Sequence, residues 1–329
     1  MEQNSITKIR NTPLIEYKGK VPNNNKIFLK KECSNPFGSH YDRVYLALFR
    51  HYEKTGVLKK GAKVFETSSG TAGASFAGIA KELGYKAHVA IPKGIDKAII
   101  KVITDYGAKI YFTPEKDYIA GFPKFLKEFK PWDKGFVYLN HSMGRKTDAG
   151  FSDNQITLDA LCNIAKETKD KIDYYIPAVG NGSSILGPGK IFKKRGAKIV
   201  AFESFQSAVA YDQLYPGKYE KKYGIKPGTL PKHKLRGTSY QGIIFPHITH
   251  AINQNLIDDV YLVSDKEQDA NYKKITSKNA PSLPHWDSIP KRKYGKSTRA
   301  GLAITLEISK KVKNKSFLVI WYDNANRYD

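Results

Sequence analysis

Residues 35–43 read Asn-Pro-Phe-Gly-Ser-His-Tyr-Asp-Arg, and the seventh residue of this stretch, Tyr41, limits the chemistry available to the chain. A tyrosine phenol cannot form an imine with an aldehyde. Its ordinary pKa of about 10 also makes it a poor general base at neutral pH. Lys30 and Lys31 lie just upstream in a strand-like run, and either amine is an alternative nucleophile. Tyr41 itself supplies a ring and a hydroxyl group, and no amine.

Outward from this stretch, short β-rich runs alternate with helical patterns across Gly- or Pro-bearing turns. We expect strands at 63–66, 87–91, 109–112, 174–179, 198–202 and 317–321. We expect helices at 71–83, 95–106, 154–168, from 184 to about 194, and at 298–312, with irregular segments at 211–234 and 279–296. Strand–helix–strand units form parallel pairs through right-handed crossovers. The pattern therefore predicts an α/β fold of two parallel-sheet lobes with helices on both faces.

The 329-residue chain carries a formal net charge of +24, with its lysines scattered in short pieces. We interpret this charge mainly as a solvated surface, although binding of nucleic acid or an acidic partner stays open on charge grounds. No run approaches the roughly 20 apolar residues that span a bilayer, and the first residues lack a signal-peptide pattern. Cys33 and Cys162 are too few for a disulfide framework, which favours a cytoplasmic location. His and Cys spacings predict no metal site.

The first of three glycine-rich loops, 66–73, leaves a predicted strand and opens a helix. Amides at a helix start favour a carboxylate or a phosphate, and the hydroxyls nearby add donors. The candidate substrate-binding residues are Ser68, Ser69, Gly70 and Thr71. Small residues here serve equally well for capping and close helix–strand packing, so both interpretations stay open.

The second loop joins another predicted strand to a helix and suits a phosphate group, because glycines and serines form a backbone nest. Its candidate residues are Gly180, Asn181, Gly182, Ser183 and Ser184. The Gly-Lys-Ser/Thr ending of a nucleotide P-loop is missing, which disfavours ATP. The third loop, 235–242, contributes Arg236, Gly237 and Thr238 to a polar cleft, or else forms a tight turn.

Taken in order, these segments resemble the fold-type II pyridoxal-phosphate (PLP) enzymes, the cysteine synthase, threonine synthase and tryptophan synthase β-like group. Asn11-Thr12-Pro13-Leu14 resembles the family's entry motif, and 35–43 resembles its PLP attachment segment. The loop 68–73 resembles the family's substrate-carboxylate loop, and 180–184 its phosphate cup. The resemblance covers nearly the whole chain in the right order. It implies PLP as cofactor, amino-acid-like ligands and a homodimer.

The departures from the family pattern fall at the reactive centre. Tyr41 stands where the resemblance places the Schiff-base lysine, and Thr71 where it places the asparagine that bonds the cofactor ring hydroxyl. Ser183 replaces a glycine of the cup, and Asp323 stands near the pyridine nitrogen. An aspartate there favours a protonated pyridine. The cup is better kept than the reactive centre.

The resemblance also implies a division into a large cofactor-type domain, 1–40 with 148–329, and a smaller mobile domain, 41–147. Three functions follow. The leading one is a catalytically silenced family member, a pseudoenzyme that acts by binding a ligand or partner. The second is an active β-replacement or β-elimination enzyme that holds PLP noncovalently or uses another lysine such as Lys30 or Lys31. The third is a basic protein that binds nucleic acid or an acidic partner on an enzyme fold.

Overall fold

The computed structural model describes residues 5–144, 154–230, 232–235, 237–238, 245–276, 281–291 and 293–328. The chain divides into two compact units. Unit 1 comprises 1–12, 32–163 and 326–329, and unit 2 comprises 13–31 and 164–325. Both are α/β with parallel sheets, which confirms the predicted fold class. That residues 41–147 form a smaller, mobile domain stays a prediction.

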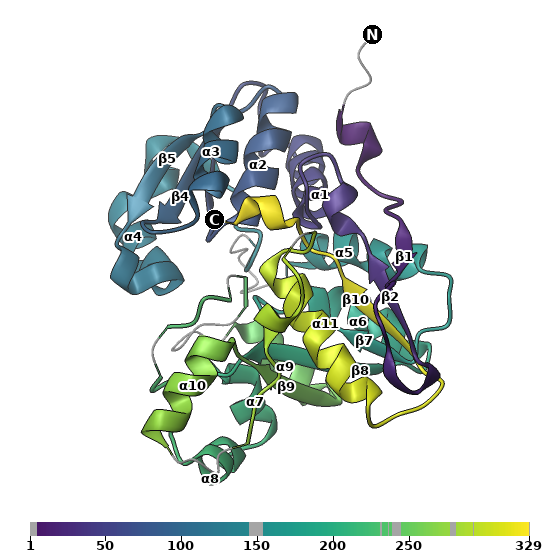
Figure 1. The fold of residues 1–329 in the computed structure, drawn as a ribbon. Coiled ribbons are helices and arrows are strands. Elements are labelled where there is room, and N and C mark those ends of the chain that lie inside the picture. Colours follow the sequence, from purple (N-terminus) through teal and green to yellow (C-terminus); the bar gives the residue numbers. More distant parts are fainter. Residues whose placement is uncertain are drawn as a thin grey trace. The chain divides into compact units, whose positions relative to one another are not determined.

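Unit 1 is built on a four-stranded sheet in the order β5-β4-β3-β6, with every pairing parallel. The strands are β3 (Lys63–Thr67), β4 (Lys86–Pro92), β5 (Lys109–Thr113) and β6 (Phe136–Tyr138). The helices are α1 (Tyr41–Lys54), α2 (Thr71–Glu82), α3 (Lys97–Asp105) and α4 (Phe122–Phe129), and α5 (Gln155–Glu167) begins in this unit. Figure 1 shows α2 and α3 beside β4 and β5.

Helix α2 lies at the centre of unit 1 because its small residues let neighbouring elements approach closely. Every residue from Ala72 to Ala80 is buried. A Cβ added at Gly78 would lie 2.2 Å from the ring of Phe37, so only glycine leaves room for that ring. The stretch 35–43 is therefore seated directly on α2.

Unit 2 is built on a six-stranded sheet in the order β1-β2-β10-β7-β8-β9. Its strands are β1 (Leu14–Glu16), β2 (Lys26–Lys30), β7 (Tyr174–Ile176), β8 (Lys198–Ser204), β9 (Asp259–Val263) and β10 (Ser316–Ile320). Only the edge pairing of β1 with β2 is antiparallel among these strands. The helices are α6 (Ser183–Lys194), α7 (Val209–Leu214), α8 (Lys218–Tyr223), α9 (Pro246–Asn253), α10 (Lys266–Ile275) and α11 (Lys296–Ser309).

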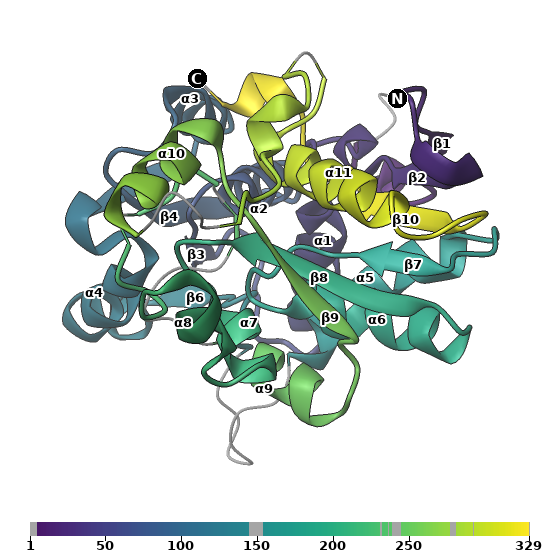
Figure 2. The ribbon, with the colours of Figure 1, turned by 60° about the horizontal axis from the view of Figure 1, so that its bottom comes forward.

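Helices cover both faces of the larger sheet, as predicted. Figure 2 shows α11 on one side of β8 and β10 and α6 on the other. The ring of Tyr175 in β7 packs on Phe192 of α6, with centroids 4.8 Å apart. Short 3₁₀ helices complete the fold: η1 (Ser5–Lys8), η2 (Pro22–Asn24), η3 (Glu32–Ser34), η4 (Glu115–Gly121), η5 (Pro131–Lys134), η6 (Trp286–Ser288) and η7 (Ala325–Arg327).

Two local predictions are wrong. Segment 211–234 is not wholly irregular, because it holds most of α7 and all of α8. Tyr219 and Tyr223 of α8 are buried in an aromatic cluster with Phe205, and this tertiary packing stabilises a helix that the Gly- and Pro-rich sequence does not favour by itself. Strand β7 ends at Ile176 rather than at 179, because the residue after it is a proline.

Candidate functional site

The predicted site residues fall in both units, and each unit's residues are described separately. In unit 1, a buried ion pair between Glu32 and Arg43 anchors the stretch 35–43. Arg43 Nε lies 2.7 Å from Glu32 Oε2, and Arg43 Nη2 lies 3.0 Å from Oε1. Thr12 Oγ1 donates to Glu32 Oε1 at 2.6 Å, and Asn35 Nδ2 donates to Oε2 at 3.0 Å. These bonds satisfy a buried carboxylate that would otherwise be strongly destabilising.

Asp42 ties the start of α1 to α2. Its Oδ2 accepts from the Phe37 amide at 2.7 Å, and its Oδ1 accepts from Ser75 Oγ at 2.6 Å. Ser39 Oγ lies 2.9 Å from Ser75 Oγ and accepts from the Tyr41 amide at 3.1 Å. Burial raises the pKa of Asp42 to about 7 in spite of these hydrogen bonds. The backbone that carries Tyr41 is therefore held by a chain of side-chain hydrogen bonds.

Tyr41 is the first residue of α1, and its half-buried ring contacts two imidazoles. Its centroid lies 4.1 Å from that of His40 and 5.3 Å from that of His141, and the latter pair meets edge to face at 87°. Burial lowers the pKa of His40 to about 3, with the nearby His141 and Arg43 lowering it further. His40 is therefore neutral at physiological pH.

His141 is a site residue that the sequence reasoning missed. Glu66 Oε2 accepts from the His141 amide at 3.1 Å and lies 3.3 Å from its Nδ1. Tyr45 Oη lies 2.9 Å from the same Nδ1, and the Thr67 amide donates to Glu66 Oε1 at 2.8 Å. A carboxylate that orients an imidazole is an arrangement suited to proton transfer. The strand that precedes it, β6, was not predicted from the sequence, so no pattern marked this histidine.

The first glycine-rich loop leaves β3 and opens α2, as predicted. Ser68 Oγ accepts from the Gly73 amide at 2.8 Å and from the Gly70 amide at 3.1 Å. The Ser68 hydroxyl therefore caps amides at the start of α2, as the capping interpretation expects. Ser69 and Thr71 are half-buried at the helix start. Binding of a substrate carboxylate by this loop stays a prediction.

In unit 2, the second loop joins β7 to α6, whose first residue is the buried Ser183. Ser183 Oγ is buried and has no hydrogen-bond partner among the described residues. The Ser183 amide donates to Asn181 Oδ1 at 3.0 Å. Gly182 has φ +92°, and a Cβ there would lie 2.7 Å from His247 Cβ. An unsatisfied buried hydroxyl at the start of a twelve-residue helix fits an anionic ligand such as a phosphate group.

The structure brings the third loop against the second. A Cβ at Gly180 would lie 3.0 Å from the carbonyl oxygen of Gly237. Thr238 Oγ1 donates to the Leu235 carbonyl at 3.0 Å, which closes this turn on itself. Arg236 lies outside the described residues. Gly237 thus lies beside Gly180 of the candidate phosphate cup, and ligand binding by this loop stays a prediction.

Asp323 follows β10 and is buried. Because β10 pairs in parallel with β7, the carboxyl end of β10 lies at the same sheet edge as the loop after β7. The Gly295 amide donates to the Asp323 carbonyl at 3.0 Å. The neighbouring Tyr322 accepts from the Ala178 amide at its hydroxyl, at 3.0 Å. Asp323 and Gly180 therefore belong to one edge of one sheet.

The two lysines considered as substitutes are both engaged within unit 2. Lys30 is 1% exposed, and its Nζ lies 2.8 Å from Glu167 Oε2. Lys31 Nζ lies over the Trp321 ring, 5.4 Å from the centroid. The Lys30 ion pair ties up that amine as a cation, which is the unreactive form of a nucleophilic lysine.

No cluster of three or more His, Cys, Asp or Glu side chains suited to a metal ion occurs in the described ranges. Among the same residues, no helix combines the length and the apolar character that crossing a membrane requires.

Comparison with known proteins adds independent findings. The family model for pyridoxal-phosphate dependent enzymes matches residues 6–275. A cysteine synthase from Buchnera aphidicola subsp. Schizaphis graminum is 31% identical, with 99% of this chain and 94% of that protein aligned. A probable cysteine synthase from Bacillus subtilis is 25% identical, with 99% of this chain and 95% of that protein aligned. A hydrogen sulfide-producing enzyme from Fusobacterium nucleatum superimposes with a TM-score of 0.78 at 23% identity, covering 100% of both chains.

Proposed function

Because the chain belongs to the pyridoxal-phosphate dependent enzyme family, with cysteine synthases among its relatives, we propose that it is a silenced member that binds a ligand without lysine catalysis. The observation that carries this proposal is Tyr41 at the start of α1, in the stretch that resembles the family's attachment segment. A phenol supplies neither the amine for covalent attachment nor a base of suitable pKa.

PLP is the cofactor of this family, and when bound it supplies an aldehyde that captures amino groups and a ring that withdraws electrons from a substrate. The unsatisfied Ser183 hydroxyl supports retention of its phosphate site. In this proposal, Gly180, Asn181, Gly182, Ser183 and Ser184 hold the phosphate, and Asp323 faces the ring nitrogen. In unit 1, Ser69, Gly70 and Thr71 offer donors for a carboxylate. In unit 2, Gly237 comes close to Gly180 of the cup.

An absorption titration with PLP tests this function, followed by borohydride reduction and mass spectrometry of the intact chain. We expect the wild type to take up PLP without covalent attachment, and Tyr41→Lys to become covalently labelled. Ser183→Ala tests the phosphate site, and it should weaken PLP uptake both in the wild type and in Tyr41→Lys. Covalent labelling of the wild type would overturn the silenced assignment, because another lysine would then serve. If neither protein takes up PLP, the phosphate-site part of the proposal is wrong.

A second candidate is a slow β-replacement or β-elimination enzyme, and the pairing of His141 with Glu66 beside Tyr41 favours it. A carboxylate-oriented imidazole can accept a proton that the missing lysine would have taken. Product formation from O-acetylserine with PLP and sulfide measures this activity. His141→Gln should abolish it, while His88→Gln, a half-buried histidine of β4, should leave it unchanged. Absence of any turnover in the wild type argues for the first candidate.

We further propose an amino-acid-like ligand, a homodimer and a cytoplasmic location, with 41–147 moving on ligand binding. Light scattering after gel filtration measures the mass in solution, and a monomer of 37.0 kDa would contradict the dimer. The described residues and the comparisons supply no observation in favour of nucleic-acid binding, which rests on net charge alone.

A further inference from the structure

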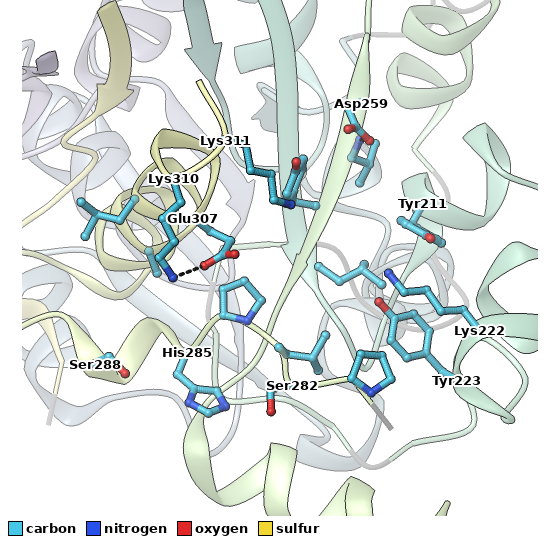
Figure 3. A pocket seen from close by; sticks show the side chains of 18 of the residues that line it. Tyr211, Lys222, Tyr223, Asp259, Ser282, His285, Ser288, Glu307, Lys310 and Lys311 are labelled. Atoms are coloured by element: carbon cyan, nitrogen blue, oxygen red, sulfur yellow. Dashed lines mark hydrogen bonds and ion pairs between the residues drawn. The ribbon is translucent and has the colours of Figure 1, made fainter. Parts of the chain in front are cut away.

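A pocket of about 980 Å³ lies in unit 2 along β9, the last strand of the six-stranded sheet. Helices α7 and α8 form one wall, and the end of α11 with the residues that follow it forms the opposite wall. Figure 3 shows Lys222 and Tyr223 on one side and Lys310 and Lys311 on the other. The volume is in the range that encloses a small organic ligand.

The charge of this pocket is positive. Lys218, Lys222, Lys310 and Lys311 contribute four ammonium groups, against the two carboxylates of Asp259 and Glu307. Both carboxylates are already engaged. Asp259 Oδ1 accepts from Tyr215 Oη at 2.7 Å, and Glu307 Oε2 pairs with Lys310 Nζ at 2.6 Å. Because Glu307 is paired with Lys310, the cations left for an incoming anion are Lys218, Lys222 and Lys311.

Three of the lysines lie over tyrosine rings that line the same pocket. The distance from Nζ to the ring centroid is 4.5 Å for Lys218 on Tyr215, 5.1 Å for Lys222 on Tyr223 and 5.7 Å for Lys311 on Tyr261. Cation–π contacts of this length hold an ammonium group near the wall. Burial raises the pKa of Tyr223 to about 12, so its phenol is neutral and adds no negative charge. The pocket thus combines aromatic faces with positioned cations.

We propose that this pocket binds a small ligand that joins a planar aromatic ring to a phosphate or diphosphate group, the chemistry of a nucleoside phosphate. The lysines of the two walls bind the phosphate oxygens as point charges, and a tyrosine face receives the ring. Lysines along an edge strand also serve to discourage sheet-to-sheet association. That role does not need tyrosine faces under the ammonium groups or a pocket of this size, and the experiment separates the two roles.

Isothermal titration calorimetry of the full chain, with adenosine 5′-diphosphate as the probe, tests this proposal. The variant K222A/K311A removes one cation from each wall and breaks no ion pair that the structure records. The control K59A/K60A removes the same charge from an exposed pair before β3. We expect at least a tenfold loss of affinity in K222A/K311A, and less than a twofold loss in K59A/K60A. Circular dichroism checks that both variants are folded.

Further titrations identify the chemistry of the ligand and the site where it binds. Pyrophosphate alone and adenosine alone should each bind at least tenfold more weakly than adenosine 5′-diphosphate. The proposal is overturned if the two double variants lose affinity equally, or if pyrophosphate binds as well as the probe. It is also overturned if no binding is detected at millimolar concentration. Tighter binding of a single-stranded oligonucleotide than of the probe would assign the pocket to nucleic acid instead.

Discussion

The ring of Tyr41 meets the ring of His141 edge to face, with centroids 5.3 Å apart. Glu66 Oε2 accepts a hydrogen bond from the His141 backbone amide and also lies close to Nδ1 of the same imidazole. Residues from α1, from the end of β3 and from the segment after β6 thus meet at one point of unit 1. Tyr41, the residue on which the proposal of a silenced enzyme rests, is therefore surrounded by polar side chains.

Arg43→Ala should cost about 3–5 kcal/mol of unfolding free energy, because it leaves the Glu32 carboxylate buried and unpaired. Arg50→Ala is a control in the same helix, since Arg50 pairs with Glu53 at 2.8 Å on the exposed surface. That variant should cost less than about 1 kcal/mol. Urea unfolding at neutral pH measures both values. Equal losses would mean that the buried pair contributes no more than a surface pair.

Asp42 should make the fold less stable as the pH rises. Its pKa is raised by burial from 3.8 to about 7, so the folded chain binds the proton more tightly than the unfolded chain between these values. Stability from this group is therefore complete below about pH 4 and is lost as the pH rises through 7. Relative to Asp42→Asn, which keeps the size, the wild type should lose on the order of 4 kcal/mol between pH 4 and pH 8. Urea unfolding across that range is the measurement, and a constant difference would contradict it.

His40 should have the opposite effect to Asp42: it should make the fold less stable as the pH falls. Burial lowers its pKa from 6.5 to about 3, so the unfolded chain takes up the proton first. Above pH 6.5 the contribution of His40 to the free energy of unfolding does not change with pH. As the pH falls from 6.5 toward 3, this residue destabilises the fold. His40→Gln should therefore gain stability relative to the wild type at pH 5, compared with pH 7.5. Thermal unfolding at the two pH values shows this, and His51→Gln, an exposed histidine of α1, is the control.

Gly182→Ala should both destabilise unit 2 and weaken PLP uptake. Its φ of +92° disfavours a side chain, and the added Cβ would meet His247 Cβ at 2.7 Å. Gly196 is a matched control, because its φ is +86° but a Cβ there meets nothing within 4 Å. Gly196→Ala should cost only the backbone term of about 1–2 kcal/mol, and Gly182→Ala more. Thermal unfolding with a PLP titration measures both effects, and equal costs would mean that the loop yields to the new methyl group.

The regular elements could be predicted because their patterns are local. The runs that became β3 and β4 are short and apolar, and α2 begins directly after a glycine-rich turn. Helix α8 could not, since Tyr219 and Tyr223 gain their stability from Phe205 and Tyr272, which lie far away in the sequence. A local pattern reports propensity and periodicity, and it does not report which distant ring completes a cluster.

The candidate site, like the fold, could be predicted from the sequence only in part. Glycine-rich turns after predicted strands located Ser68 and Ser183, because the carboxyl ends of parallel strands collect ligand-binding loops. The choice between capping and anion binding at Ser68 depended on where one hydroxyl points, which only the coordinates give. His141 was missed because its partner Glu66 is 75 residues away and no spacing rule links them. The pocket along β9 was missed for the same reason, since its lining comes from four separate segments.

The pairing of β2 with β10 sets an order on synthesis. Lys30 in β2 stands opposite Ile320 in β10, so the interior of the larger sheet joins nearly the first and nearly the last strand of the chain. During translation β2 emerges early, and its partner β10 leaves the ribosome much later. The strands of unit 1, from β3 to β6, are complete long before that. We therefore expect truncated or stalled chains to carry a folded unit 1 and an exposed, association-prone β2, which makes unit 2 the part that depends on chaperones.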